Sequence, residues 1–351
     1  MKKTERMTTQ TLVRQRLLNQ QLLSPCMDSP REIVSWMGVL QAQEYRMFPW
    51  AIGIRMTKPT RQKVAAAIDR HEIVCAHLNR ATWQVVSSED IHWMVRLYGE
   101  RNKKLAYGYY RRDFEPSVLS RCYDFLHTTL EGGRSLTCEE LIPLFRESGI
   151  SQDKDFVKHL LRVAEADGIL CGGDMRSRYH SYALLDERIP QKTLLSTEES
   201  LMLLARKYFQ SHAPATWEDY RWWSGLTAGE CKIGLSLIEK ELDTFNLSGQ
   251  TYYTHERNRN GRMNHSLVHF LPPYDELLLG YKNRTATLAE HHEAYAHNTH
   301  GLFYPIILQK GQVIGNWNIT PSLTHKFFHE TITPMETEIS GAEKRVKAFF
   351  G

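Results

Sequence analysis

Two glutamines flank one alanine in the segment LQAQEYRMFPWAIGIR, which covers residues 40–55. A glutamine amide offers an acceptor oxygen and two donor hydrogens, and it does not titrate. Such a group can orient a water molecule, but it cannot remove the water's proton as a carboxylate would. Gln41 and Gln43 are therefore candidates for holding a water at a substrate whose leaving group is already activated.

The spacing of the two amides constrains the backbone that carries them. Residues two apart point about 200° apart on a helix, but to the same side of an extended chain. An amphipathic helix is expected just before this segment, so it must end near Leu40 if both amides are to face one reacting atom. Ala42 would then point into the protein. A second interpretation stays open, in which both glutamines cap the helix end and bond to nearby main chain.

The bulk composition is that of an ordinary soluble globular protein, with 351 residues, 42% of them hydrophobic and 24% charged. This length predicts two to four compact units. The start, MKKTERMTTQTLVRQ, is charged and polar, and no stretch of 18 apolar residues follows, so we expect a cytoplasmic protein that does not enter membranes. The six cysteines lie far apart without a C-x-x-C pair, which predicts free, mostly buried thiols and no zinc site.

The charge pattern is more informative than the formal net charge of +4, which decides nothing by itself. Residues 96–113 interleave basic side chains with tyrosines, and residues 255–265 gather three arginines around a glycine. Basic residues beside planar rings suit a phosphate backbone with exposed bases. A solvated loop is the alternative interpretation of both stretches.

The first region predicts helices over residues 9–19, from Pro30 after Ser29 as N-cap, and over 60–72. Residues 73–87 are rich in β-branched and aromatic side chains and split around Asn79 and Arg80, as a hairpin does. Ser88 is expected to cap the next helix. Helix, helix, helix, hairpin is the order of a winged helix.

This order returns twice along the chain. Helices are expected from Thr137 and over residues 153–168, before a hairpin over 169–185, and again after Pro214 and over 227–242, before strands around a Ser-Gly turn. The remainder is richer in β-strand, with a turn at Lys310-Gly311. We therefore predict an α+β, mainly helical fold of three tandem winged-helix motifs with a β-richer C-terminal region, in domains of residues 1–115, 116–195, 196–264 and 265–351. Winged helices mostly bind nucleic acid, although some bind proteins.

Four segments in the same order resemble the signatures of the AlkZ/YcaQ group of bacterial DNA glycosylases, whose members carry three tandem winged helices. They are LQAQEYRMFPWAIGIR, LNRATWQVVSSED, APATWEDYRWWSGL and LPPYDELLLGYKNR. Two positions depart from the family pattern. Gln84 stands where a histidine is usual, and the first motif is Q-x-Q rather than the Q-x-D of the YcaQ branch.

The resemblance implies a monofunctional DNA glycosylase that removes alkylated purines, including bases in interstrand crosslinks, with Gln41 and Gln43 as its catalytic residues. The implied partner is double-stranded DNA with alkylated bases, bound by a monomer in the cytoplasm at the nucleoid, with neither cofactor nor metal. The expected DNA contacts are Arg80 in the first hairpin, Arg176 and Arg178 in the second wing, and Arg257, Arg259 and Arg262 in the third. The alternative is a winged-helix DNA-binding protein without catalysis, such as a regulator or crosslink sensor.

Other residues could do chemistry, but each has a simpler explanation. Glu293, His297 and His300 could share a helical face as metal ligands, although the H-E-x-x-H spacing is missing and a solvated loop is favoured. Asp275 and Glu276 could assist the site or bond to backbone N–H groups. The tryptophans at helical spacing favour a place in the core. These are Trp217, Trp222 and Trp223.

Overall fold

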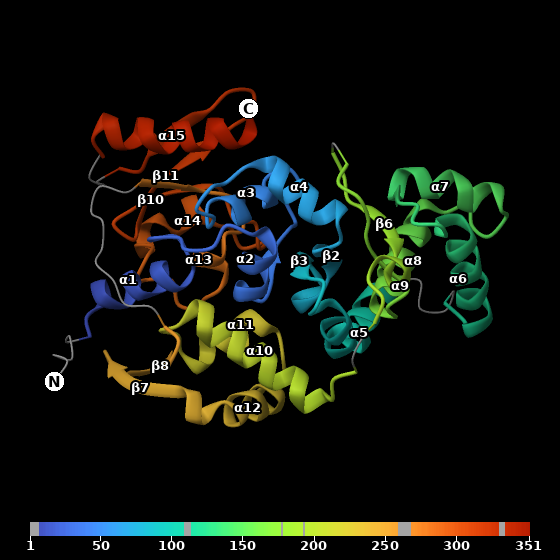
Figure 1. The fold of residues 1–351 in the computed structure, drawn as a ribbon, viewed down its shortest axis with the longest axis horizontal. Coiled ribbons are helices and arrows are strands. Elements are labelled where there is room, and N and C mark those ends of the chain that lie inside the picture. The colour runs from blue at the N-terminus through green and yellow to red at the C-terminus, as the bar shows by residue number, and fades with distance from the viewer. Residues whose placement is uncertain (1–6, 109–113, 177, 192–193, 259–267, 330–333) are drawn as a thin grey trace. The chain divides into compact units, whose positions relative to one another are not determined.

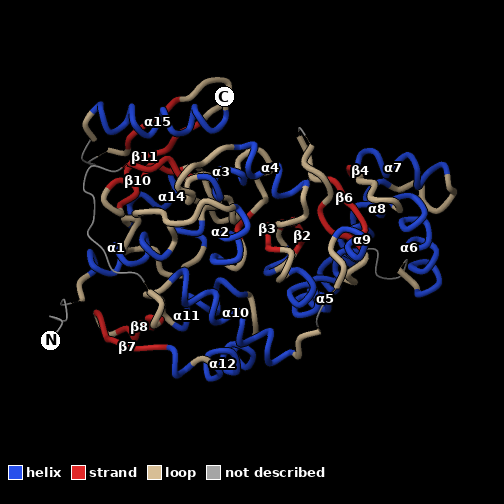
Figure 2. Tube along the Cα trace, viewed as in Figure 1, coloured by secondary structure: helices blue, strands red, loops and turns tan. Residues whose placement is uncertain are grey.

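A computed structural model describes residues 7–108, 114–176, 178–191, 194–258, 268–329 and 334–351. Helices alternate with small antiparallel sheets (Figures 1 and 2), which confirms the predicted α+β, mainly helical class. The chain divides into two compact units. Unit 1 comprises residues 1–64 and 201–351, and unit 2 comprises residues 65–200.

Unit 2 contains a complete helix-strand-helix-helix-strand-strand segment, which is the element order of a winged helix. Its three-stranded sheet has the order β4-β6-β5, and both pairings are antiparallel. The capping box predicted at Thr137 forms, because the Thr137 hydroxyl accepts from Glu140 N and the Glu140 carboxylate accepts from Thr137 N. The elements are α6 (Pro116–Leu130), β4 (Leu136–Thr137), α7 (Cys138–Glu147), α8 (Lys154–Ala166), β5 (Leu170–Gly172) and β6 (Ser181–Leu184), followed by α9 (Leu185–Arg188).

The hairpin predicted around Asn79 and Arg80 is also present in unit 2, as β2 (Ile73–His77), the short helix η1 (Asn79–Ala81) and β3 (Trp83–Ser87). Helix α5 (Ile91–Tyr107) follows, with Asp90 as its N-cap residue. The prediction that Ser88 caps this helix was wrong. Ser88 N donates to Glu72 O, which keeps Ser88 in the hairpin hydrogen-bonding pattern.

Unit 1 opens with α1 (Thr9–Asn19), α2 (Pro30–Met37), β1 (Leu40–Gln41) and α3 (Phe48–Gly53). Helix α4 (Arg61–Asp69) begins in unit 1 and ends in unit 2. Helix α10 (Thr197–His212) begins in unit 2 and ends in unit 1. After α10 come α11 (Trp217–Ser224), α12 (Ala228–Leu237), the short helix η3 (Glu239–Glu241) and the hairpin of β7 (Leu242–Leu247) and β8 (Gln250–His255). The predicted Ser-Gly turn of this hairpin forms with positive φ at Ser248 and Gly249.

The C-terminal part of unit 1 is the β-richer region that the sequence predicts. Its antiparallel sheet has the order β12-β11-β10-β9, and the predicted turn at Lys310-Gly311 joins β10 to β11. The strands are β9 (Val268–Leu271), β10 (Ile306–Gln309), β11 (Gln312–Asn318) and β12 (Thr324–Phe327). The helices are α13 (Glu276–Leu279), η4 (Glu290–His292), α14 (Glu293–Ala296) and α15 (Glu336–Phe350).

Helix α15 packs on β9, and its last turn contacts α3. The Phe349 ring lies 5.0 Å from the Trp50 ring, and a Cβ on Gly53 would collide with Phe349. A core of leucines from α1, α13 and the sheet lies beneath, including Leu12, Leu17, Leu278 and Leu308. Within the described ranges, no helix has the length and apolar character needed to cross a membrane. All six cysteines are free, and four of them are buried, as predicted.

Candidate active site

The Gln-x-Gln segment leaves α2 in the way its spacing requires. Helix α2 ends at Met37, and Gly38 turns the chain with φ of 81°. Leu40 and Gln41 are extended as β1, and Ala42 is fully buried. Both structural conditions, a helix that ends before Leu40 and an inward-facing Ala42, are therefore met.

The two glutamines differ in their surroundings. Gln41 is only 6% exposed, and its Oε1 accepts a hydrogen bond of 3.1 Å from Ala42 N. This contact is to main chain, but not to the end of α2, where Gly38 is the C-cap residue. Gln43, in contrast, is exposed to solvent. One amide is thus fixed against the backbone, and the other is accessible to a substrate.

Glu44 does not follow the simple alternation expected of an extended segment. The chain bends at Gln43 and Glu44, so the alternation of an extended chain does not determine the direction of the Glu44 side chain. Glu44 is exposed, and its carbonyl accepts from Met47 N and Phe48 N at 3.0 Å each, which starts the turn into α3. In α3, Trp50 Nε1 donates to Phe270 O at 2.7 Å and anchors the turn to β9.

The opposite end of the segment rests on α10 and α11. A Cβ on Gly38 would lie 3.3 Å from the Lys207 Cβ and 3.6 Å from the Trp223 ring. Lys207 Nζ also donates to Ser35 O at 2.8 Å, which ties the last turn of α2 to α10. Gln41 is therefore placed by contacts on both sides of its short strand.

Tyr274 is a residue near the segment that sequence reasoning missed. Partial burial raises the pKa of its hydroxyl, with smaller contributions from the charges of Glu44 and Tyr304. Its φ of 59° is a left-handed conformation, which costs energy for any residue other than glycine. Because strained backbone is common at functional sites, Tyr274 is a further candidate residue of this site. In the sequence, Tyr274 follows two prolines in the signature LPPYDELLLGYKNR, and this triplet could have identified it.

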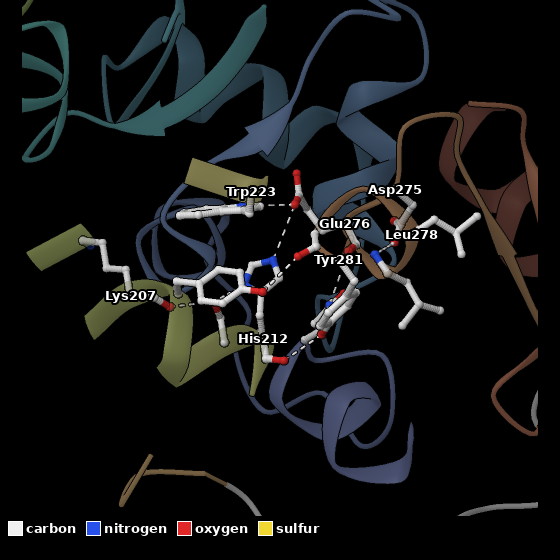
Figure 3. A network of polar contacts seen from close by, with 12 residues as sticks. Lys207, His212, Trp223, Asp275, Glu276, Leu278 and Tyr281 are labelled. Carbon is white, nitrogen blue, oxygen red and sulfur yellow. Dashed lines mark hydrogen bonds and ion pairs between the residues drawn. The ribbon is translucent and has the colours of Figure 1, made fainter. Parts of the chain in front are cut away.

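The carboxylates of that signature belong to a buried polar network (Figure 3). Asp275 receives two hydrogen bonds of 2.8 Å from the Arg55 guanidinium, and both side chains are at most 1% exposed. Asp275 Oδ1 also accepts from Leu277 N at 2.9 Å and so caps α13. Asp275 therefore has a structural role.

Glu276 lies between two aromatic side chains in the same network (Figure 3). Its Oε2 accepts from Trp223 Nε1 at 3.1 Å and lies 3.4 Å from His212 Nε2. Burial lowers the pKa of His212 and favours the neutral ring, although the Glu276 charge opposes this shift. The Tyr281 hydroxyl donates to His212 O at 2.7 Å. The interpretation as a carboxylate that bonds to backbone N–H fits Asp275, whereas Glu276 bonds to the side chains of Trp223 and His212.

The tryptophans of the third signature are not all in the core. Trp223 is fully buried, as predicted, but Trp222 is 41% exposed, so its assignment to the core was wrong. Trp217 is partly exposed at the first position of α11. Neighbouring residues on a helix point about 100° apart, and here Trp223 faces inward while Trp222 faces outward.

The Arg80 hairpin in unit 2 is held by buried amides. Arg80 has φ of 57° in its turn. Gln84, which replaces the usual histidine, is fully buried, and its Oε1 accepts from Asn79 N at 3.2 Å. Asn102 Nδ2 donates to the carbonyls of His77 and Leu78 at 3.1 and 2.8 Å. The glutamine thus fixes the turn that carries Arg80.

The other predicted DNA contacts lie in or near the wings. Arg176 and Arg178 are exposed between β5 and β6, and Arg176 donates to Ser135 O at 2.6 Å. Arg257 is exposed and follows the end of β8, outside the turn of that hairpin. That turn is Ser248-Gly249. Arg259 and Arg262 lie outside the described residues.

The histidine-rich stretch does not form one helical face. Helix α14 ends at Ala296, and His297 has an extended backbone with φ of −156°. Glu293, His297 and His300 therefore cannot share the i, i+4, i+7 arrangement of a single helix. Among the residues that the structure describes, no three His, Cys, Asp or Glu side chains are grouped as metal ligands.

These elements define an α+β protein in which helix-helix-hairpin segments recur and one segment bears a partly exposed Gln-x-Gln pair. A family model described as DNA glycosylase AlkZ-like matches residues 34–349, and the chain belongs to this family of DNA glycosylases. The match spans both glutamines and all four signatures.

A solved structure, the Streptomyces sahachiroi DNA glycosylase AlkZ, is similar to this chain with a TM-score of 0.79 and 18% sequence identity. The similarity covers 99% of this chain and 98% of that chain, so the two share their fold over nearly the whole length. No curated protein sequence matches the chain.

Proposed function

We propose that this protein is a monofunctional DNA glycosylase that hydrolyses the N-glycosidic bond of cationic alkylated purines in double-stranded DNA, bases in interstrand crosslinks included. It would act as a monomer on DNA in the cytoplasm. Family membership supports the reaction class. The observation that carries the choice of residues is the Gln-x-Gln segment itself, where a buried Ala42 separates the fixed Gln41 from the exposed Gln43.

The chemistry fits neutral amides. A purine alkylated at N7 of guanine or N3 of adenine carries a positive charge, so it takes the electron pair of the C1′–N bond and leaves as a neutral base. Little acid catalysis is needed. The remaining tasks are to stabilise a positively charged sugar and to hold a water at C1′, and positioning of this kind can lower a barrier by several kcal/mol. The attacking water then loses its proton to solvent.

The two amides would divide this work. Gln43, which is exposed, would orient the water through its amide oxygen, while Gln41 would place its amide against the sugar from a fixed position. Gln41 Oε1 already accepts from Ala42 N, and this bond limits how the side chain can turn. Neither group titrates near neutral pH, so neither needs to change its protonation state during the reaction.

DNA would be held by arginines that contact phosphate. The assigned residues are Arg80 at the strained hairpin turn, the exposed Arg176, Arg178 and Arg257, and Arg259 and Arg262. Arg80 lies on a fixed turn, which can present its side chain to DNA at small entropic cost. The others would contribute sequence-independent affinity.

One incubation tests the proposed function against a non-catalytic DNA-binding protein. A duplex methylated at N7 of guanine is treated with the protein, and strand breaks are counted before and after alkali. We expect alkali-dependent breaks at guanines and none without alkali, as a monofunctional enzyme leaves intact abasic sites. A duplex that contains uracil should stay intact. Tight binding of the methylated duplex without abasic sites would instead support a regulator or lesion sensor.

A further inference from the structure

The third and fourth signature segments meet in the folded chain and form one exposed element. Asp219 of α11 is buried, and its Oδ1 accepts from Lys282 N at 2.9 Å and Asn283 N at 3.2 Å. Its Oδ2 accepts from Thr216 N at 3.1 Å and lies 3.4 Å from Arg16 Nη2. One carboxylate thus fixes the turn 282–284 against the start of α11.

The same turn places the Arg284 guanidinium beside the exposed ring of Trp222. The Arg284 guanidinium lies 5.4 Å from the centre of the Trp222 ring and 5.2 Å from that of Phe303. Arg284 Nε also donates to Leu278 O at 2.8 Å, which sets the direction of the side chain. Trp222 is 41% exposed and Lys282 is exposed, so a ring and an ammonium group reach solvent from one rigid support.

We infer that Lys282 and Trp222 form a further DNA contact, in which the Lys282 ammonium group binds the phosphodiester backbone and the Trp222 ring, supported by Arg284, packs against the sugar or base beside it. Cations beside an exposed aromatic ring are the combination that proteins use along nucleic acid strands. No described acidic side chain forms an ion pair with Lys282, and the buried carboxylate of Asp219 is already bonded to backbone and to Arg16. The choice of DNA as ligand rests on the proposed function.

One acidic neighbour provides an internal check on this assignment. Glu218 is exposed on α11 one turn before Trp222, and residues four apart on a helix lie on the same face. A phosphate at this element would be repelled by Glu218. Removal of that charge should therefore strengthen DNA binding, whereas removal of Lys282 should weaken it.

Binding of an undamaged fluorescent duplex at several salt concentrations tests the inference in the full-length protein. We expect Lys282→Ala to reduce the slope of log K against log salt by about one and Trp222→Ala to weaken binding several-fold. Glu218→Gln should strengthen binding. Lys344→Ala, which removes an exposed lysine from α15, should leave both affinity and slope at the wild-type values.

Equal slopes for Lys282→Ala, Lys344→Ala and the wild type would overturn the inference, as would Glu218→Gln binding more weakly than the wild type. Both lysines are exposed, so a folding defect is not expected, and thermal melting of each variant confirms this. Failure of the proposed function gives a different result. The wild type would then release no methylated base, while the dependence of undamaged-DNA binding on Lys282 would persist.

Discussion

Two groups of polar side chains in unit 1, most of them from signature segments, have different surroundings. In the buried network, the side chains of Arg55, Asp275, Glu276 and His212 are at most 1% exposed, and each has a partner within the protein. In the Gln-x-Gln segment, Gln43 faces solvent. The carboxylates and the histidine can titrate, whereas the amides cannot, but in this protein they stabilise the fold. Of the two neutral amides, Gln41 is held against the backbone, and Gln43 is the one exposed to solvent.

The largest effect on stability should come from breaking the buried ion pair. Asp275→Ala leaves the Arg55 guanidinium without its bidentate partner in a site that excludes water, and loss of one partner of such a pair costs about 3–5 kcal/mol. Urea denaturation should show this loss against Lys344→Ala as the control. A change below about 1 kcal/mol would mean that Asp275 is not structural and would reopen its catalytic interpretation.

A buried histidine should make this scaffold sensitive to acid. Burial lowers the pKa of His269 to about 4, and its Nε2 donates to Leu22 O at 2.7 Å. Because the folded pKa lies below the unfolded value of about 6.5, the unfolded state takes up the proton first. The stability from neutral His269 is fully present above about pH 6.5 and is lost progressively as the pH falls to about 4.

Between pH 7.5 and pH 5 this residue alone should therefore cost about 2 kcal/mol of unfolding free energy. His269→Gln can still donate to Leu22 O but cannot be protonated, so its stability should fall less over the same interval. Denaturation of both proteins at the two pH values gives the comparison. Parallel losses would show that His269 does not contribute.

Gly38 connects the two regions, because it precedes the Gln41 strand and lies against Trp223. Gly38→Ala places a Cβ at φ of 81°, where side chains are strained, and should cost about 1–2 kcal/mol. It should also reduce excision, since Gln41 moves with the turn. Gly229→Ala, in α12 with nothing near its Cβ, is the control. Unchanged excision in Gly38→Ala would show that the turn at Gly38 does not determine the position of Gln41.

The exposed arginines should affect binding but not the chemical step. Simultaneous neutralisation of Arg176, Arg178 and Arg257 should lower the salt slope of DNA binding by about one for each phosphate contact that is lost. Excision at saturating protein should change little, because these side chains are assigned to affinity. Salt titrations with an undamaged duplex measure the first quantity, and an unchanged slope would remove the three arginines from the interface.

Much of the fold could be predicted where residues close together in the sequence determine the end of a helix or strand. Thr137 with Glu140, Pro30 after Ser29 and the Lys310-Gly311 turn each specify an element end through a few neighbouring residues. Helices α6, α10 and α15 were not predicted. Helix α15 is largely polar, and three buried residues, Ala342, Val346 and Phe349, pack it on unit 1. Its position depends on distant residues such as Trp50.

The backbone of the candidate site could be predicted from the sequence, but the contacts around it could not. The spacing of Gln41 and Gln43 predicted an extended segment with a buried Ala42, because side-chain direction follows from backbone periodicity. The bend at Gln43 and Glu44 and the left-handed backbone of Tyr274 were not predicted, because side-chain periodicity does not specify where a chain turns. The exposure of Trp222 likewise follows from which of two adjacent rings reaches Glu276.

The central claim is that neutral glutamines, and no titrating base, perform the excision. It is tested most directly by the single-turnover rate of 7-methylguanine release between about pH 6 and pH 9 by wild type, Gln41→Ala, Gln43→Ala and Glu44→Gln. We predict a flat profile for the wild type, a loss of about 100-fold or more for each alanine variant with DNA binding retained, and a small change for Glu44→Gln. An acid limb that disappears in Glu44→Gln together with most of the activity, while Gln43→Ala stays active, would contradict the claim.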